Sequence, residues 1–172
     1  MTVTASIIPC LWFDNTAQEA MNFYVSVFSG SPHHSQDSRI ISVKHYEEGM
    51  KVPGMPEMKG KVLTGIFELA GQRFMALDGG LVFKFSEAVS FYVECDTQEE
   101  LDYFWGKLSA DPAAEQCGWL KDRYGLSWQI IPKVLAEYSS DPDPVKANRV
   151  INAMLDMKKI DITAIERAYQ EP

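Results

Sequence analysis

The sequence predicts an α+β protein built from two related strand–helix modules and a helical tail. The segment QEAMNFY at residues 18–24 recurs as QEELDYF at residues 98–104, with two identical positions and four close exchanges. Each copy follows a short apolar run that ends in Asp, at residues 7–14 and 89–96. Such a duplication suggests two open half-sheets that pair around a cleft, so a ligand pocket is the first functional hypothesis.

A length of 172 residues fits one ordinary domain or two small, closely packed modules. We therefore expect a single domain over residues 1–172. Within it we expect pseudo-repeat modules at 5–80 and 86–133 and a C-terminal helical tail at 141–170.

The charge and the hydropathy of the sequence argue against two classes of partner, nucleic acids and membranes. The formal net charge is −8 and the Lys and Arg residues form no long cluster, which argues against nucleic-acid binding. The sequence has no apolar run long enough to span a bilayer, and residues 1–6 lack the basic start of a signal peptide. We expect a cytoplasmic protein that binds neither nucleic acid nor membrane.

The three cysteines, Cys10, Cys95 and Cys117, form no CxxC pair. An odd number of cysteines without a signal peptide indicates reduced thiols rather than disulfides. We expect them to be buried as small apolar side chains.

The first module begins with a strand within residues 5–13 and a helix over residues 17–28. Thr16 and Glu19 have the spacing of a capping box at the start of that helix. The apolar positions expected to face the core follow three-four spacing: Ala17, Ala20, Met21, Tyr24, Val25 and Phe28.

The rest of this module reads as three strands and a long loop. A strand is expected at residues 40–46, and residues 47–59, rich in Pro, Gly and Met, are expected to form a loop over a pocket. Residues 61–69 and 72–77 then predict a hairpin around the tight turn Ala70–Gly71.

The second module repeats this order after a linker at residues 78–88, in which Phe83 and Phe85 are expected to be half-buried. We expect a strand at 89–95, a helix capped by Asp96 or Thr97 and ending near Leu108, and strands at 114–121 and 126–131.

The pattern changes after Pro132. Asp141–Pro144 starts a helix with proline at a permitted position, and its expected inward face carries Val145, Val150, Met154 and Met157. A last short helix begins at residues 160–163. This tail lies outside the repeat, and it packs either on the sheet or on a second subunit.

Three segments carry a resemblance to a known family: residues 83–91, 117–132 and 153–162. They resemble the PhnB-like group, also labelled the 3-demethylubiquinone-9 3-methyltransferase domain family. This group is part of the vicinal oxygen chelate superfamily, with glyoxalase I, extradiol dioxygenases and bleomycin-resistance proteins. The resemblance implies two βαβββ modules that form a curved mixed sheet with a cleft, and a homodimer.

Active members of that superfamily hold a divalent metal on four strands. In this chain the matching positions offer two oxygen donors, Asp78 and Gln129, which do not make a transition-metal site. His33 and His34 read as exposed loop residues, and His45 lies in a strand where it can face a pocket. We therefore expect no metal and no other cofactor. The chain also lacks a GxGxG loop, which disfavours the methyltransferase chemistry of the family label.

The expected cleft is lined by aromatic, Met and isolated polar residues: Trp12, His45, Tyr46, Phe67, Met75, Asp78, Tyr92, Trp119, Trp128 and Gln129. The leading hypothesis is a protein that binds a small, partly apolar molecule without metal. Three alternatives stay open: a metal-dependent glyoxalase- or dioxygenase-like enzyme, a metal-free enzyme with Asp78 as its acid or base, and a purely structural dimer.

Overall fold

The computed structural model describes residues 6–32, 37–50, 52, 55 and 57–171. The chain divides into two compact units. Unit 1 contains the described residues of 1–30 and 34–84, and unit 2 contains those of 31–33 and 85–172.

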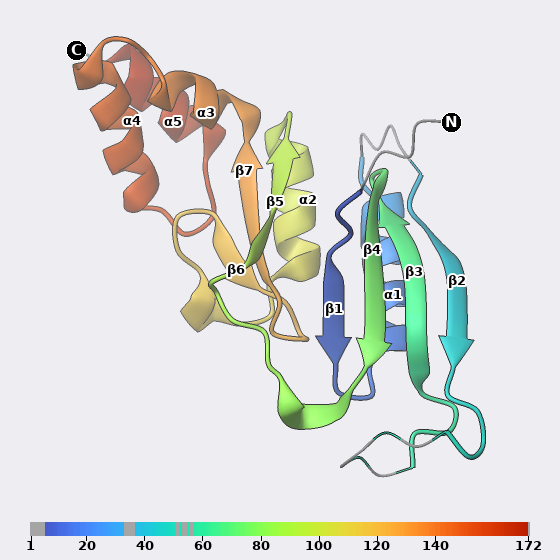
Figure 1. The fold of residues 1–172 in the computed structure, drawn as a ribbon. Helices are drawn as coiled ribbons and strands as arrows, with labels where there is room; N and C mark the ends of the chain where they lie inside the picture. Colours follow the sequence, from blue (N-terminus) through green and yellow to red (C-terminus); the bar gives the residue numbers. More distant parts are fainter. Residues whose placement is uncertain (1–5, 33–36, 51, 53–54, 56, 172) are drawn as a thin grey trace. The chain divides into compact units, whose positions relative to one another are not determined.

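Unit 1 is a four-stranded sheet with one α-helix behind it (Figure 1). Its elements are β1 (Cys10–Phe13), α1 (Ala17–Ser29), β2 (Arg39–His45), β3 (Val62–Leu69), β4 (Gln72–Asp78) and the 3-10 turn η1 (Gly80–Val82). The strand order is β1-β4-β3-β2, with β1 parallel to β4 and the other pairs antiparallel. The expected helix and hairpin are confirmed.

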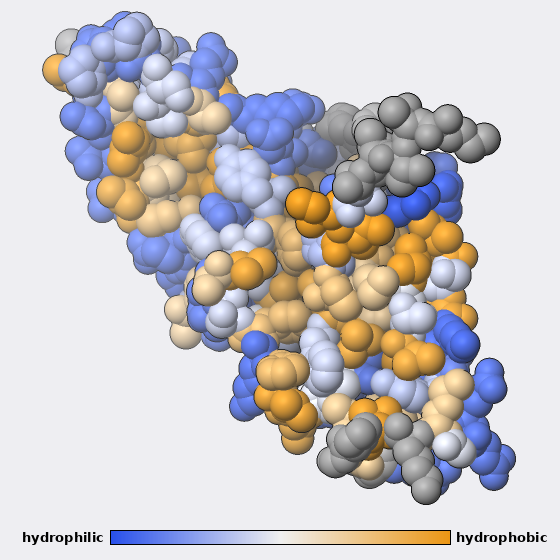
Figure 2. Space-filling view, in the orientation of Figure 1, coloured by the Kyte–Doolittle hydropathy of each residue, from blue (hydrophilic) through white to orange (hydrophobic). Residues whose placement is uncertain are grey.

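The two faces of this sheet differ in burial. On the helix side, alternate strand residues such as Leu11, Phe67 and Ala76 are buried with α1. The other face carries side chains of intermediate exposure: Trp12, Thr64, Ile66, Met75 and Leu77. Figure 2 shows apolar side chains gathered over this second face.

The start of α1 differs from the expected capping box. Thr16 makes no side-chain capping hydrogen bond. Instead, the backbone N–H of Ala17 donates to Oδ1 of Asp78 over 2.9 Å. The cap therefore comes from the end of β4, because the parallel pairing of β1 with β4 brings Asp78 level with Phe13. This partner is 61 residues away in sequence, so a local pattern did not reveal it.

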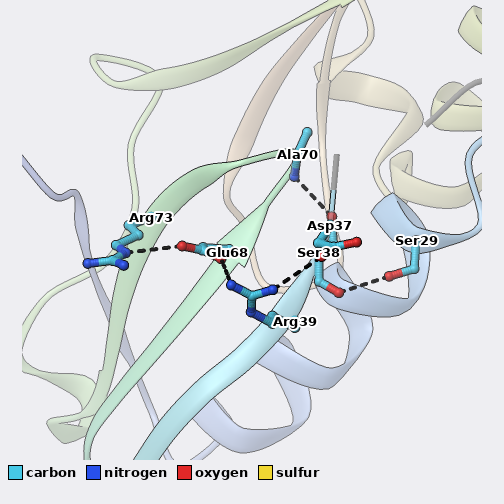
Figure 3. A network of polar contacts seen from close by, with 7 residues as sticks. All are labelled: Ser29, Asp37, Ser38, Arg39, Glu68, Ala70 and Arg73. Carbon is cyan, nitrogen blue, oxygen red and sulfur yellow. Dashed lines mark hydrogen bonds and ion pairs between the residues drawn. The ribbon is translucent and has the colours of Figure 1, made fainter. Parts of the chain in front are cut away.

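The β3–β4 hairpin is held at its turn and along its edge. Ala70 and Gly71 both have positive φ, 46° and 79°, as a two-residue type I′ turn requires. The Glu68 carboxylate, 12% exposed, lies between the guanidinium groups of Arg39 and Arg73, at 3.0 and 3.1 Å. Figure 3 shows this network, which joins β2, β3 and β4.

Unit 2 repeats the strand–helix plan with a three-stranded sheet. Its elements are β5 (Ser90–Cys95), α2 (Gln98–Leu108), the 3-10 turn η2 (Pro112–Ala114), β6 (Trp119–Lys121), β7 (Ser127–Pro132), α3 (Lys133–Ser139), α4 (Pro144–Leu155) and α5 (Ile162–Gln170). The strand order is β5-β7-β6, with β5 parallel to β7. Thr97 caps α2, accepting from the backbone N–H of Glu100.

The expected strand at 114–121 is wrong over its first half. Residues Pro112–Ala114 form the η2 turn. Cys117 and Gly118 have positive φ, 50° and 83°, which an extended strand does not allow. Strand β6 is therefore limited to Trp119–Lys121.

The C-terminal tail packs on unit 2. The backbone N–H groups of Cys117 and Gly118 donate to the carbonyl oxygens of Met157 and Lys158 over 2.8 and 2.7 Å. Ile160 is fully buried. The tail therefore packs beside the sheet of its own chain, which was one of the two arrangements expected from the sequence.

Helix α4 is confirmed, and α3 was not expected. The expected inward face of α4 is partly wrong, because Val145 is 61% exposed whereas Val150 is fully buried. Within the described part of the chain, no helix has both the length and the apolar character needed to cross a bilayer.

Candidate functional site

Unit 2 contains a cavity of about 920 Å³ between its sheet and the tail. The sheet contributes Tyr92, Trp119, Gln129 and Ile131. The helices contribute Leu135, Ala136 and Ser139 from α3 and Ile151, Met154 and Leu155 from α4. Glu87, Ala114, Gln116 and Cys117 complete the wall. In Figure 2 apolar side chains gather beside α4 in this part of unit 2.

Three residues expected to bind ligand form one row across the sheet. The strand register places Tyr92 opposite Gln129, and Trp119 opposite Gln129 on the other side. Their neighbours Leu120, Trp128 and Ile130 are buried on the face that packs against α2. Strand alternation therefore turns the row Tyr92–Gln129–Trp119 toward the cavity.

The polar groups of the cavity are few. The Gln129 side chain is oriented by Ser90, because its Nε2 donates to Ser90 Oγ over 2.8 Å. Among the described lining residues Glu87 is the one charged side chain, and it forms an ion pair with Lys121. The hydrogen bond from Lys121 holds the pKa of the Glu87 carboxyl below its usual value.

Two of the expected lining residues belong to the cores. Phe67 is fully buried beside Phe74, with ring centroids 5.4 Å apart. Trp128 is 2% exposed, and its Nε1 donates to Oδ2 of Asp122 over 2.8 Å. In each case the side chain points to the helix-covered face of its sheet.

Trp12 of unit 1 holds the turn that follows β4. Its Nε1 donates to the carbonyl oxygen of Gly80 over 2.8 Å, and its ring meets Phe83 edge-on at 4.9 Å. A Cβ atom at Gly79 would lie 2.0 Å from the Trp12 ring, so this position has no room for a side chain. Phe83 is 62% exposed, so the expectation that it is half-buried is wrong, whereas Phe85 is half-buried as expected.

Asp78 is a structural residue. Its carboxylate is 2% exposed, and its two oxygens accept from the backbone N–H groups of Ala17 and Val62, each over 2.9 Å. The side chain thus joins the end of β4 to the starts of α1 and β3. We do not retain it as a catalytic candidate, because both carboxylate oxygens are engaged in the core.

The remaining unit 1 candidates are spread out. Tyr46 donates from its hydroxyl to the carbonyl oxygen of Asp78 over 3.4 Å. His45 is exposed at the end of β2, and Met75 lies on the second face of the sheet.

The loop expected over a pocket, residues 47–59, falls partly outside the described residues, at positions 51, 53–54 and 56. Met55 and Met58, which are described, line a second cavity of about 590 Å³ with Gly79, Leu81 and other residues of unit 1.

The described residues contain no group of three His, Cys, Asp or Glu side chains arranged to hold a metal ion. His33 and His34 lie outside the described residues.

Sequence reasoning missed the helical wall of the cavity. The periodicity of Val150 and Met154 predicted a helix, and Met154 does line the cavity. The same pattern did not say which surface the helix covers, because amphipathic spacing identifies a buried face without identifying its partner.

The sequence and the fold of this chain are similar to those of known proteins. A family model described as 3-demethylubiquinone-9 3-methyltransferase matches residues 5–131. A PhnB protein from Bacillus cereus is 36% identical, with a TM-score of 0.57, over 74% of this chain and 99% of that chain. A comparison with curated proteins found no match.

Two further solved structures are more distant. A protein from Pseudomonas aeruginosa is 17% identical with a TM-score of 0.52, over 73% of this chain and 95% of that chain. The fosfomycin resistance protein FosX from Mesorhizobium loti is 9% identical with a TM-score of 0.44, over 74% of this chain and 90% of that chain.

Proposed function

Because this chain belongs to the 3-demethylubiquinone-9 3-methyltransferase (PhnB-like) family, we propose that it binds a small, partly apolar molecule in the cavity of unit 2. The observation that carries the proposal is the row Tyr92–Gln129–Trp119, which opens into a cavity of about 920 Å³. Pockets for small molecules typically have volumes of about 300–1,000 Å³ and a mainly apolar lining with a few placed polar groups.

The proposal names no reaction. The methyltransferase of the family label would use a Gly-rich turn that opens an α-helix, where backbone N–H groups meet the cofactor. Here Gly79 and Gly80 lead into the 3-10 turn Gly80–Val82 and then an extended residue, Phe83. This geometry gives no helix N-terminus for such a cofactor at that position.

We also propose a homodimer, as the family resemblance implies, and a cytoplasmic location, as the sequence analysis led us to expect. Light scattering on the purified protein measures the mass directly, and a mass of one chain at micromolar concentration would contradict the dimer.

The thiol of Cys117 can report on ligand binding in the cavity. Cys117 lines the cavity and is partly exposed. Cys95 is fully buried, and burial raises the pKa of its thiol to about 12, so it stays unreactive toward alkylating reagents at pH 8. In a Cys10→Ser background, alkylation therefore reports on Cys117.

The experiment screens small apolar and aromatic compounds for slower alkylation of Cys117. We expect some of these compounds to slow the alkylation of Cys117. We expect Ala136→Trp to abolish this protection of Cys117, because Ala136 lines the cavity and a bulky ring there would fill it. Glu137→Trp is the matched control, because the neighbouring residue is exposed and outside the lining. Absence of any protecting compound, or an equal loss in both variants, would rule out this cavity as the binding site.

A further inference from the structure

We infer that the ligand of this cavity is an uncharged, planar ring compound with an N–H and a C=O on adjacent ring atoms, recognised by the side-chain amide of Gln129. This inference rests on the proposed function and gives the ligand a chemical class. Three features of the cavity support it: its charge, its shape and the state of the Gln129 amide.

The charge of the lining favours a neutral ligand. Glu87 is the single charged residue among the described lining residues, and Lys121 already neutralises it. A charged ligand in this cavity would have to break that ion pair to find a partner. Since burying an unpaired charge is costly, an uncharged ligand fits this lining best.

The shape of the floor favours a flat ligand. Cross-strand neighbours lie about 5 Å apart, so the row Tyr92–Gln129–Trp119 spans about 10 Å, the length of two fused rings. The two aromatic rings offer stacking surfaces. The facing wall from α4 carries Ile151 and Met154, and a Met side chain adapts to an aromatic surface and contacts it favourably.

The amide of Gln129 leaves two groups for a ligand. A Gln side chain has two N–H donors and one carbonyl acceptor. One donor is engaged with Ser90 Oγ over 2.8 Å. The second N–H and Oε1 have no hydrogen-bond partner among the described residues. We take the N–H that points away from Oε1 as the one bonded to Ser90 Oγ. The remaining N–H then lies beside Oε1, and the complement of this pair is a C=O beside an N–H, as on the edge of a lactam.

The test uses three compounds of nearly the same shape. 2-Quinolinone has the lactam edge, 1-methyl-2-quinolinone retains the C=O without the N–H, and naphthalene has neither group. Their dissociation constants are measured by protection of Cys117 in the Cys10→Ser background, with Gln129 and with Gln129→Leu. Thermal unfolding of both proteins confirms that the variant is folded, and Gln129→Met serves as a second variant of similar length.

We expect 2-quinolinone to bind most tightly to the protein with Gln129. Loss of one hydrogen bond should weaken 1-methyl-2-quinolinone by about tenfold. In Gln129→Leu the difference between these two compounds should shrink to less than about threefold, while naphthalene binds at least as well as before. The ratio of the two dissociation constants is compared between the protein with Gln129 and Gln129→Leu. The steric effect of the methyl group is present in both proteins and therefore cancels.

The outcomes separate this inference from the proposed function. If naphthalene or other panel members protect Cys117 but the lactam edge gives no advantage, the inference is wrong and the cavity remains a binding site. The same holds if the charged 1-naphthoate binds more tightly than 2-quinolinone. If no compound protects Cys117, both the inference and the proposed function are wrong.

Discussion

Units 1 and 2 share one strand–helix plan and differ in what lies beside the second face of each sheet. Among the described residues, unit 1 has four strands and the single α-helix α1 on one face. Unit 2 has three strands, α2 on one face, and α3 and α4 along the cavity on the other. The cavity with the aromatic–amide row therefore depends on helices added after the repeat, and duplication alone does not produce it.

The repeated glutamines show how the tail is attached to unit 2. Gln18 of α1 makes one exposed contact, from its Nε2 to Oδ1 of Asn22 over 3.5 Å. Its counterpart Gln98 in α2 accepts from the Ile162 N–H at its Oε1 over 2.9 Å, and donates to the Ile160 carbonyl oxygen over 3.2 Å. The same position of the repeat thus acquired a structural role in one unit and stayed a surface residue in the other.

The largest effect that tests the comparison of the two units is expected at Gly118, where the tail contacts the sheet of unit 2. Gly118 has φ +83°, and an added Cβ would lie 2.3 Å from Ile131 Cδ1 and 3.2 Å from the carbonyl oxygen of Ile130. We expect Gly118→Ala to lower the free energy of unfolding by about 2–4 kcal/mol, from backbone strain and overpacking together. Urea denaturation followed by Trp fluorescence measures this.

Gly125 is the matched control for that substitution. Its φ is +82°, but an added Cβ would meet nothing within 4 Å, so Gly125→Ala should cost about 1–2 kcal/mol, from backbone strain alone. Equal losses at the two positions would show that the close approach of Ile130 and Ile131 of β7 to Gly118 adds nothing to the cost of the substitution.

A second, smaller effect distinguishes the two glutamines. We expect Gln98→Ala to lower the free energy of unfolding by about 1–2 kcal/mol, because it leaves the partly buried Ile162 N–H and Ile160 carbonyl groups without their partner. Gln18→Ala should change it by less than about 0.5 kcal/mol, as is usual at the surface. Losses of the same size would contradict the contrast drawn between the two units.

The smallest expected effect is a pH dependence of the tail contact. The hydrogen bond from Lys159 of the tail is the main cause that lowers the pKa of the Asp102 carboxyl on α2. A carboxyl whose pKa is lowered in the folded state stabilises the protein at pH values above its pKa in the unfolded state, about 3.9. This stabilisation is lost as the pH falls through the pKa of the folded state. The contribution should stay under about 1 kcal/mol, since both side chains are more than 40% exposed.

Urea midpoints between pH 5 and pH 2 measure this contribution. We expect the midpoint of the natural protein to fall more steeply than that of Lys159→Gln, which lacks the cation. Parallel curves would show that this ion pair does not stabilise the attachment of the tail.

Much of the fold was predictable because its signals are local. The spacing of Ala17, Ala20, Met21 and Tyr24 predicted the buried face of α1, and all four are buried. Val25 was wrongly placed there, and Val27 is buried in its place. Ala70–Gly71 predicted the hairpin turn because Gly71 tolerates positive φ, whereas Ala70 adopts its φ of 46° despite its Cβ.

Candidate site residues were harder to predict, since alternation along a strand shows that two faces exist without showing what covers each. Trp119 and Trp128 looked equivalent in the sequence, yet Trp119 lines the cavity and Trp128 is 2% exposed in the core. Asp78 looked like a catalytic group at the end of a strand, and its partners Ala17 and Val62 became visible only in three dimensions.

The sequence by itself determined the family, the repeated strand–helix order and most helix and hairpin positions, because these depend on short-range periodicity and turn chemistry. The tertiary structure decided which face of each strand is buried, that Asp78 serves the core, and that the tail forms one wall of a cavity with Tyr92, Gln129 and Trp119. Those outcomes depend on contacts between residues about 10 to 61 positions apart, and packing between such segments leaves no local pattern in the chain.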